Sequence, residues 1–151
     1  MSGADDRPPP AAPQALLVAV DFSPSARRAL DLSIAWWGAA EITALHVVDT
    51  TFTARVEAEG LGTATEAIAG MRKRANEEFS WWLQEKGADA FDPMIVEGIP
   101  FVEIVKIAND LEVDLIVMGM HRAALRVDEL LFGSTAEKVL RTSGRPVLCV
   151  P

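Results

Sequence analysis

The chain has 151 residues, of which 50% are hydrophobic and 24% charged, and its formal net charge is −8 at pH 7. This length and apolar content suit one domain with a buried core and exclude a largely disordered protein. The acidic balance argues against binding to nucleic acid or to anionic membranes. The single cysteine cannot form a disulfide framework or a cysteine-based zinc site, and no apolar run approaches the ~18 residues of a membrane span.

The first 14 residues form a proline-rich lead. They contain four of the nine prolines and no hydrophobic periodicity, so we expect residues 1–14 to be disordered and residues 15–151 to form the folded domain. The lead lacks the apolar segment of a secretory signal. Together with the low cysteine content, this favours a cytoplasmic protein.

Apolar runs typical of buried strands alternate with amphipathic stretches after the lead. Residues 15–20 form the first such run. The pair Ser23-Pro24 then predicts the N-cap and first position of a helix that Gly38 ends. A second strand is expected over residues 41–48.

The next stretch, residues 50–65, contains Gly60 and Gly62, and we expect it to be a mobile loop. The remaining elements are expected in the following order: a helix with an apolar stripe from Ile68 to Trp82 that ends at residues 86–87, a strand over residues 93–97, a helix from Pro100, a strand over residues 114–119, a loop over residues 120–132, a helix over residues 135–142, and a strand over residues 146–150.

This alternation of strands and helices predicts an α/β fold. The connections are too long for hairpins, so the strands should form a single doubly wound parallel sheet with helices on both faces, in a Rossmann-like arrangement. Ligands of such folds bind beyond the carboxyl ends of the strands. The segments that could carry function are therefore residues 21–25, 47–49, 97–99 and 119–135.

A candidate anion site lies between the fourth strand and the helix that follows it. Gly119 ends the strand and would let a ligand approach the backbone, while Gly133, Ser134 and Thr135 offer amide groups, hydroxyls and the positive end of a helix. A second interpretation needs no ligand, because Ser134 and Glu137 also have the spacing of a capping box. Both can hold at once through different amide groups.

Asp21 and the two histidines allow more than one interpretation. Asp21 could bind a ribose hydroxyl or an adenine amine, or it could be a turn residue that accepts a hydrogen bond from nearby backbone. We interpret His46 as a hydrogen-bonded residue of the sheet and His121 as either a loop residue or a phosphate contact. The chain has no P-loop and no G-x-S-x-G motif, and its histidines are 75 positions apart, so neither catalytic nor metal-binding residues are assigned.

The last strand should lie at an edge of the sheet. Its residues Val147–Val150 carry no charge, and an exposed apolar edge recruits a partner strand. We therefore predict a homodimer in which this strand pairs with its copy. The alternative is that the lead or a loop covers the edge.

Four phrases of the sequence resemble the universal stress protein family over residues 15–151. They are VAVDFSPSARRAL, LHVVD, DLIVMGMHR and FGSTAEKVLRTSGRPVLCVP. The family pattern is G-x-x-G, nine residues, then G-[ST]. The resemblance implies a five-stranded parallel sheet in the order 3-2-1-4-5, a homodimer joined through the final strands, and, in one subclass, bound ATP.

The resemblance also implies a set of nucleotide-binding residues. Around the adenine and ribose it places Ala19, Val20, Asp21 and, through its backbone, Val47. Against the ribose and phosphates it places Gly119, His121, Arg122, Gly133, Ser134 and Thr135. Arg122 stands where the pattern has its second glycine, and the gap from there to Gly133 is ten residues, 123–132, instead of nine. An arginine at this position could reach the phosphates as a charged donor.

Three functional hypotheses follow. The leading one is an adenine-nucleotide-binding, dimeric stress-response protein that binds ATP, with or without Mg, in a regulatory role and with slow hydrolysis at most. The second is a protein-interaction scaffold of the same fold, whose phosphate site Arg122 and the longer loop disable. The third is a hydrolase or transferase that uses Asp21, His121 and Ser134.

Overall fold

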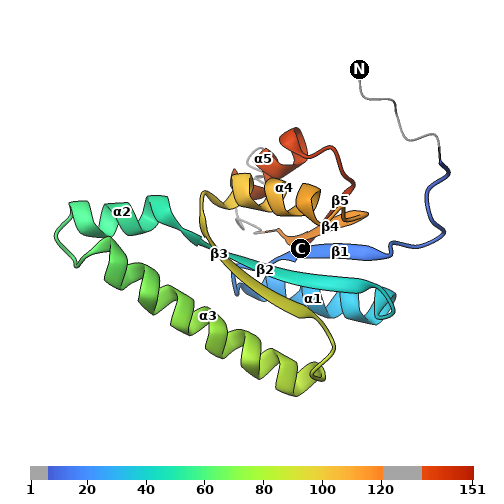
Figure 1. Cartoon of the computed structure of the whole chain (residues 1–151), viewed down its shortest axis with the longest axis horizontal. Coiled ribbons are helices and arrows are strands. Elements are labelled where there is room, and N and C mark those ends of the chain that lie inside the picture. The colour runs from blue at the N-terminus through green and yellow to red at the C-terminus, as the bar shows by residue number, and fades with distance from the viewer. Residues whose placement is uncertain (1–6, 121–133) are drawn as a thin grey trace.

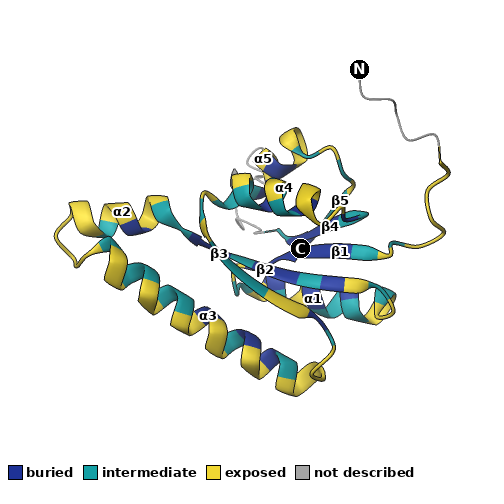
Figure 2. Ribbon diagram, in the orientation of Figure 1, coloured by how far each residue is buried: buried dark blue, intermediate teal, exposed yellow. Residues whose placement is uncertain are grey.

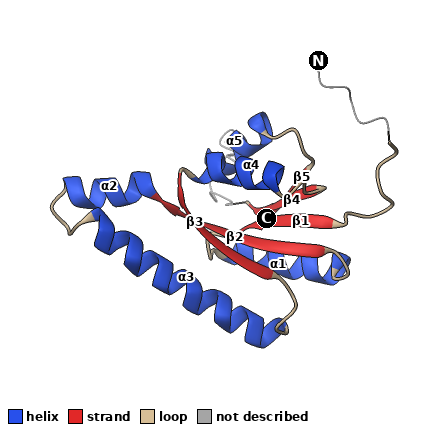
Figure 3. Cartoon of the chain, in the orientation of Figure 1, coloured by secondary structure: helices blue, strands red, loops and turns tan. Residues whose placement is uncertain are grey.

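The computed structural model describes residues 7–120 and 134–151, which form a sheet with helices on both faces (Figures 1 and 3). In chain order the elements are β1 (Ala15–Ala19), α1 (Pro24–Trp37), β2 (Glu41–Asp49), α2 (Thr50–Ala58), α3 (Ala64–Lys86), β3 (Asp92–Gly98), α4 (Pro100–Asp110), β4 (Leu115–Gly119), α5 (Ser134–Thr142) and β5 (Val147–Val150). In these two ranges no helix has the length and apolar content needed to cross a membrane.

The sheet has five parallel strands in the order β3-β2-β1-β4-β5. This confirms the predicted fold class and the strand order that the family resemblance implies. β1 lies at the centre, where Leu17 pairs in register with Thr43 of β2 and with Ile116 of β4. The chain winds outward in both directions from β1, so the loops after β1 and β4 diverge at the carboxyl edge of the sheet.

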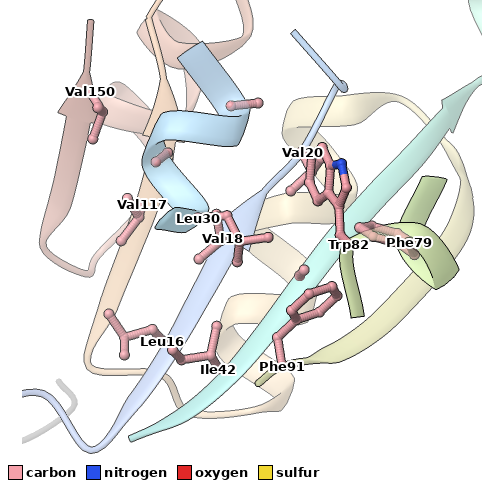
Figure 4. Packing of buried hydrophobic residues seen from close by; sticks show 13 residues of the cluster. Leu16, Val18, Val20, Leu30, Ile42, Phe79, Trp82, Phe91, Val117 and Val150 are labelled. Atoms are coloured by element: carbon pink, nitrogen blue, oxygen red, sulfur yellow. The ribbon is translucent and has the colours of Figure 1, made fainter. Parts of the chain in front are cut away.

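The core lies on both faces of β1. Leu16 and Val18 pack with residues of α1 and α3, whereas Leu17 and Ala19 pack with residues of α4 and α5. Figure 4 shows the first of these halves, and Figure 2 shows that buried residues run along the central strands. A continuous apolar strand is required here because both of its faces are covered.

The first helix begins where the sequence predicts. Ser23 is the N-cap, and its hydroxyl accepts a hydrogen bond from the Ala26 amide at 3.2 Å. Pro24 occupies the first helical position, which needs no amide hydrogen. The helix ends at Trp37, immediately before Gly38.

The expected mobile loop over residues 50–65 is wrong. The structure has α2 from Thr50 to Ala58, and only a short connection through Gly60 and Gly62 separates it from α3. The helix forms because the Asp49 carboxylate accepts hydrogen bonds from the amides of Thr51 and Phe52, at 2.9 and 3.4 Å. The last residue of β2 is therefore also the N-cap of α2.

The other expected helix and strand boundaries agree with the structure to within one or two residues, whereas the expected loop over residues 120–132 lies, apart from Met120, outside the described residues. β1 ends at Ala19, one residue earlier than expected, and α5 begins at Ser134, one residue earlier than expected. Residues 7–14 of the lead contain no helix or strand, and their end is held where the Asp114 carboxylate accepts hydrogen bonds from the amides of Gln14 and Ala15.

The cap of α2 can be tested by replacing Asp49 with alanine. We expect α2 to fray and the free energy of unfolding to fall by about 1 kcal/mol, because two amides lose their acceptor. Hydrogen exchange over residues 53–58 and urea unfolding measure the two effects. Asp49→Asn, which keeps a capping oxygen, is the matched control. Equal exchange in the alanine and asparagine variants would contradict this role of Asp49.

Candidate functional site

A cavity of 340 Å³ opens at the carboxyl edge of the sheet. It is lined by residues from the ends of β1, β2 and β4 and from α3, α4 and α5. These residues are Ala19, Val20, Asp21, Leu45, His46, Val47, Asp49, Met71, Pro100, Ile104, Met118, Gly119, Thr135 and Ala136. The position agrees with the expectation that a doubly wound sheet binds its ligand where the winding direction reverses.

Six of the residues that the sequence suggests for nucleotide binding lie around this cavity. They are Ala19, Val20, Asp21, Val47, Gly119 and Thr135. His121, Arg122 and Gly133 lie outside the described residues. Ser134 is the first residue of α5, but its side chain also falls outside the described part of the structure.

The floor of the cavity is apolar and continuous with the core. Ala19, Val47, Ile104, Met118 and Ala136 all belong to the half of the core that packs under α4 and α5. The polar side chains of the cavity come from strand ends and from the start of α5. An apolar floor with a few polar groups at its rim suits an aromatic ring that carries polar substituents.

Asp21 acts as a turn residue in the structure. One of its carboxylate oxygens, Oδ1, accepts hydrogen bonds from the Ser23 amide at 3.0 Å and from the Ser23 hydroxyl at 2.5 Å. The turn interpretation is therefore correct, and the same exposed side chain also lines the cavity. The two roles are compatible because a carboxylate offers acceptor positions on both oxygens.

Gly119 has a packing role beside the ligand approach that the sequence suggests. A Cβ at this position would lie 2.5 Å from the Ala26 nitrogen and 2.6 Å from the Ser25 carbonyl carbon. The start of α1 thus occupies the space that a side chain would fill. Gly119 lines the cavity, but its missing side chain accommodates the backbone of the protein itself.

His46 belongs both to the sheet and to the cavity wall. Its Nδ1 lies 2.7 Å from the carbonyl oxygen of Val20, so Nδ1 carries the hydrogen and donates it, as expected for a hydrogen-bonded sheet residue. Burial lowers the pKa of His46 below its usual 6.5. The bond to Val20 and the charge of Asp21 act in the opposite direction. The ring is therefore held neutral at physiological pH.

The start of α5 lies at the cavity, because Thr135 and Ala136 line it. The first amides of a helix have no acceptor within the helix and form a positive end. Glu137, which the capping-box interpretation pairs with Ser134, accepts a hydrogen bond through Oε1 from Arg141 at 2.7 Å, one turn further along.

Several cavity residues were not identified from the sequence. Asp49 stands at a strand end that the sequence did indicate, but no role was assigned to it. Met71 comes from α3 and Ile104 from α4, and their apolar stripes predict burial without distinguishing core from cavity wall. Only the packing of the helices onto the sheet reveals these contacts. In the described residues, no group of three histidine, cysteine, aspartate or glutamate side chains could hold a metal ion.

Comparisons with known proteins agree on one family. The model of the "Universal stress protein family" matches residues 13–151. The chain is 34% identical to the universal stress protein MJ0577 of Methanocaldococcus jannaschii, over 89% of this chain and 93% of that protein. The solved structure of MJ0577 superposes with a TM-score of 0.73 and covers 91% of this chain and 94% of that chain.

Two more distant solved structures contain nucleotides. A universal stress protein in complex with cAMP has a TM-score of 0.59 at 23% identity and covers 93% of this chain and 98% of that chain. One from Archaeoglobus fulgidus in complex with dAMP has a TM-score of 0.58 at 21% identity and covers 91% of this chain and 98% of that chain. At these identities the likeness shows the fold alone.

The packing role of Gly119 predicts the effect of Gly119→Ala. A methyl group would press on the backbone of α1, so we expect the free energy of unfolding to fall by about 1–3 kcal/mol in urea titrations. Gly70→Ala is the matched control, because Gly70 lies inside α3 with nothing within 4 Å of an added Cβ. It should stabilise the protein by about 0.5–1 kcal/mol. A Gly119→Ala protein as stable as the parent would contradict the close approach.

The lowered pKa of His46 predicts a pH dependence of stability. Well above pH 6.5 the ring is neutral in the folded and unfolded states. As the pH falls from 6.5 towards the lower pKa of the folded state, the unfolded chain binds the proton first, so the free energy of unfolding decreases. Below about pH 7.5, the free energy of unfolding of His46→Gln, measured in urea, should therefore depend less on pH than that of the parent. If the free energy of unfolding depends on pH equally in the parent and in His46→Gln, the buried neutral state of the His46 ring is contradicted.

Proposed function

The chain belongs to the universal stress protein family, and on that premise we propose that it binds an adenine nucleotide, ATP, in the cavity at the carboxyl edge of the sheet. Its role would be regulatory, in a stress response. The observation that carries this proposal is the cavity itself: an apolar floor large enough for a base lies next to the positive start of α5.

The residues divide by chemistry into two groups. Ala19, Val20 and Val47 provide apolar surface and backbone groups for the adenine ring, and Asp21 provides acceptors for a ribose hydroxyl or an amine. The phosphates would lie toward Gly119, Thr135 and the start of α5, with Gly133, Ser134, His121 and Arg122 assigned to them by the family pattern. The cAMP and dAMP in the more distant relatives are also adenine nucleotides, which supports this class of ligand.

The charges at the cavity favour ATP with its magnesium ion. Asp21 and Asp49 place negative groups in the wall, where they would repel a bare triphosphate. No three-residue metal site exists in the ranges 7–120 and 134–151, so the phosphates themselves would supply most of the ligands of Mg²⁺. Arg122 would add a positive charge from the loop.

Binding is proposed as the function, with slow hydrolysis at most. A hydrolase needs a group that can take a proton from water or from a serine. In the described cavity His46 uses Nδ1 to donate to the Val20 carbonyl, and Asp21 uses Oδ1 to accept from Ser23. These bonds give both side chains a structural task, and we propose no catalytic task for either, although Nε2 of a ring that carries its hydrogen on Nδ1 can still accept a proton.

We also propose a homodimer through Val147–Val150. β5 is an edge strand that pairs in the described residues with β4 alone, and no charged residue interrupts it. Pairing of β5 with its copy would satisfy the open backbone groups of both edges.

Isothermal titration with ATP and Mg²⁺ tests the nucleotide site, and saturable binding below millimolar ATP is expected. Thr135→Ala should weaken binding about tenfold if it loses one hydrogen bond to phosphate. Thr142→Ala, at the far end of the same helix, is the matched control and should bind as the parent does. No binding at millimolar ATP would end the proposal. Native mass spectrometry of freshly purified protein reports both a co-purified nucleotide and the dimer mass.

The second candidate function is a protein-interaction scaffold with a disabled phosphate site. Arg122 in place of a glycine and the ten-residue gap that follows are the observations that favour it. Arg122→Gly separates the two functions: ATP binding that appears only in this variant supports the scaffold. If the parent protein binds ATP and Arg122→Gly weakens that binding, the result supports the nucleotide site.

A further inference from the structure

Phe22 has an unusual backbone conformation beside the cavity. Its φ is 63°, in the left-handed region that bulky residues rarely adopt. It lies between Asp21, which lines the cavity, and Ser23, which caps α1. Such a conformation persists only where the surrounding structure holds it in place.

Aromatic contacts hold the Phe22 side chain. Its ring centre lies 4.7 Å from that of His46, 5.1 Å from that of Phe79 and 5.5 Å from that of Trp82. Phe79 and Trp82 come from α3 and are almost fully buried. Figure 4 shows these two side chains beside Val20 in the same half of the core. The ring of Phe22 therefore anchors the loop to the opposite face of the sheet from the cavity floor.

Hydrogen bonds fix the chain on both sides of Phe22. The Val20 amide donates to the Leu45 carbonyl, and the Val20 carbonyl accepts from His46, both at 2.7 Å. On the other side, Asp21 accepts from the Ser23 amide. His46 thus contacts the Phe22 ring and also holds the backbone just before Asp21.

We propose that Phe22 is a positioning residue for the nucleotide site. Its ring, packed on His46, Phe79 and Trp82, keeps the loop in the left-handed conformation that places Asp21 at the rim of the cavity. The effect on ligand affinity rests on the proposed nucleotide binding, whereas the effect on the loop does not. Phe22 itself does not line the cavity, so it acts through Asp21.

The test compares Phe22→Ala with Phe91→Ala. Phe91 packs on Phe79 at 5.8 Å in the same cluster, but it precedes β3 and does not line the cavity. Both variants should lower the melting temperature. Phe22→Ala alone should weaken ATP binding about tenfold and accelerate hydrogen exchange at the Ser23 amide, whose acceptor is Asp21. Equal affinities and equal exchange in the two variants would overturn the proposal.

Two more variants keep the test decisive. Phe22→Gly removes the conformational strain together with the ring, so it should show the same losses as Phe22→Ala. If Phe22→Gly binds ATP as the parent does and its Ser23 amide exchanges as slowly, the proposal is overturned. The loop would then keep its conformation without the ring. Phe22→Leu replaces Phe22→Ala if the latter does not fold, with smaller changes in the same direction. A Phe22→Leu variant whose ATP affinity and Ser23 amide exchange both equal those of the parent would overturn the proposal.

The same measurements separate this inference from the proposed function. If the parent protein binds no nucleotide, the proposed function fails. Hydrogen exchange at the Ser23 amide and the NMR resonances of the His46 ring still test whether Phe22 holds the loop. If the exchange rate of the Ser23 amide and the His46 ring resonances are the same in the parent and in Phe22→Gly, the positioning role is overturned. If the parent binds ATP and Phe22→Ala binds it equally well, the inference alone fails.

Discussion

The start of α1 packs directly on the last residue of β4, and this approach fixes the carboxyl edge of the sheet. It is possible only because residue 119 has no side chain, since a Cβ there would lie 2.5 Å from the Ala26 nitrogen. The chain turns from β1 into α1 within the four residues from Val20 to Ser23. The left-handed conformation of Phe22 and the turn formed by Asp21 both lie within these four residues.

The cavity and the core share their residues. Val47, Ile104 and Met118 form part of the cavity wall and are also buried under α4 and α5. A ligand that fills the cavity would extend the apolar packing of this half of the core. Binding and folding are then coupled, because a ligand that binds only the folded chain stabilises it in proportion to the logarithm of its concentration over Kd.

The sequence predicts most of the fold because each buried strand is a continuous apolar run and α1 carries the Ser-Pro start of a helix. It does not predict α2, because the residue that caps this helix, Asp49, also ends a strand, and the glycines that follow suggest a loop. The polar rim of the cavity follows strand ends that the sequence indicates. Met71 and Ile104 could not be found in this way, since their place in the wall depends on how helices distant in sequence pack on the sheet.

The acidic character of the chain makes the proposed phosphate site depend on local groups. The net charge of −8 repels an anion at long range, but salt screens this repulsion beyond about 8 Å. Among the groups that line the cavity, Asp21 and Asp49 would oppose a phosphate, while the start of α5 would favour it. A glycine in the family pattern contributes only close backbone approach, whereas arginine contributes a full charge. By its chemistry, an arginine in place of the pattern's glycine is therefore compatible with the proposed anion site, because it would add a positive charge next to an acidic rim.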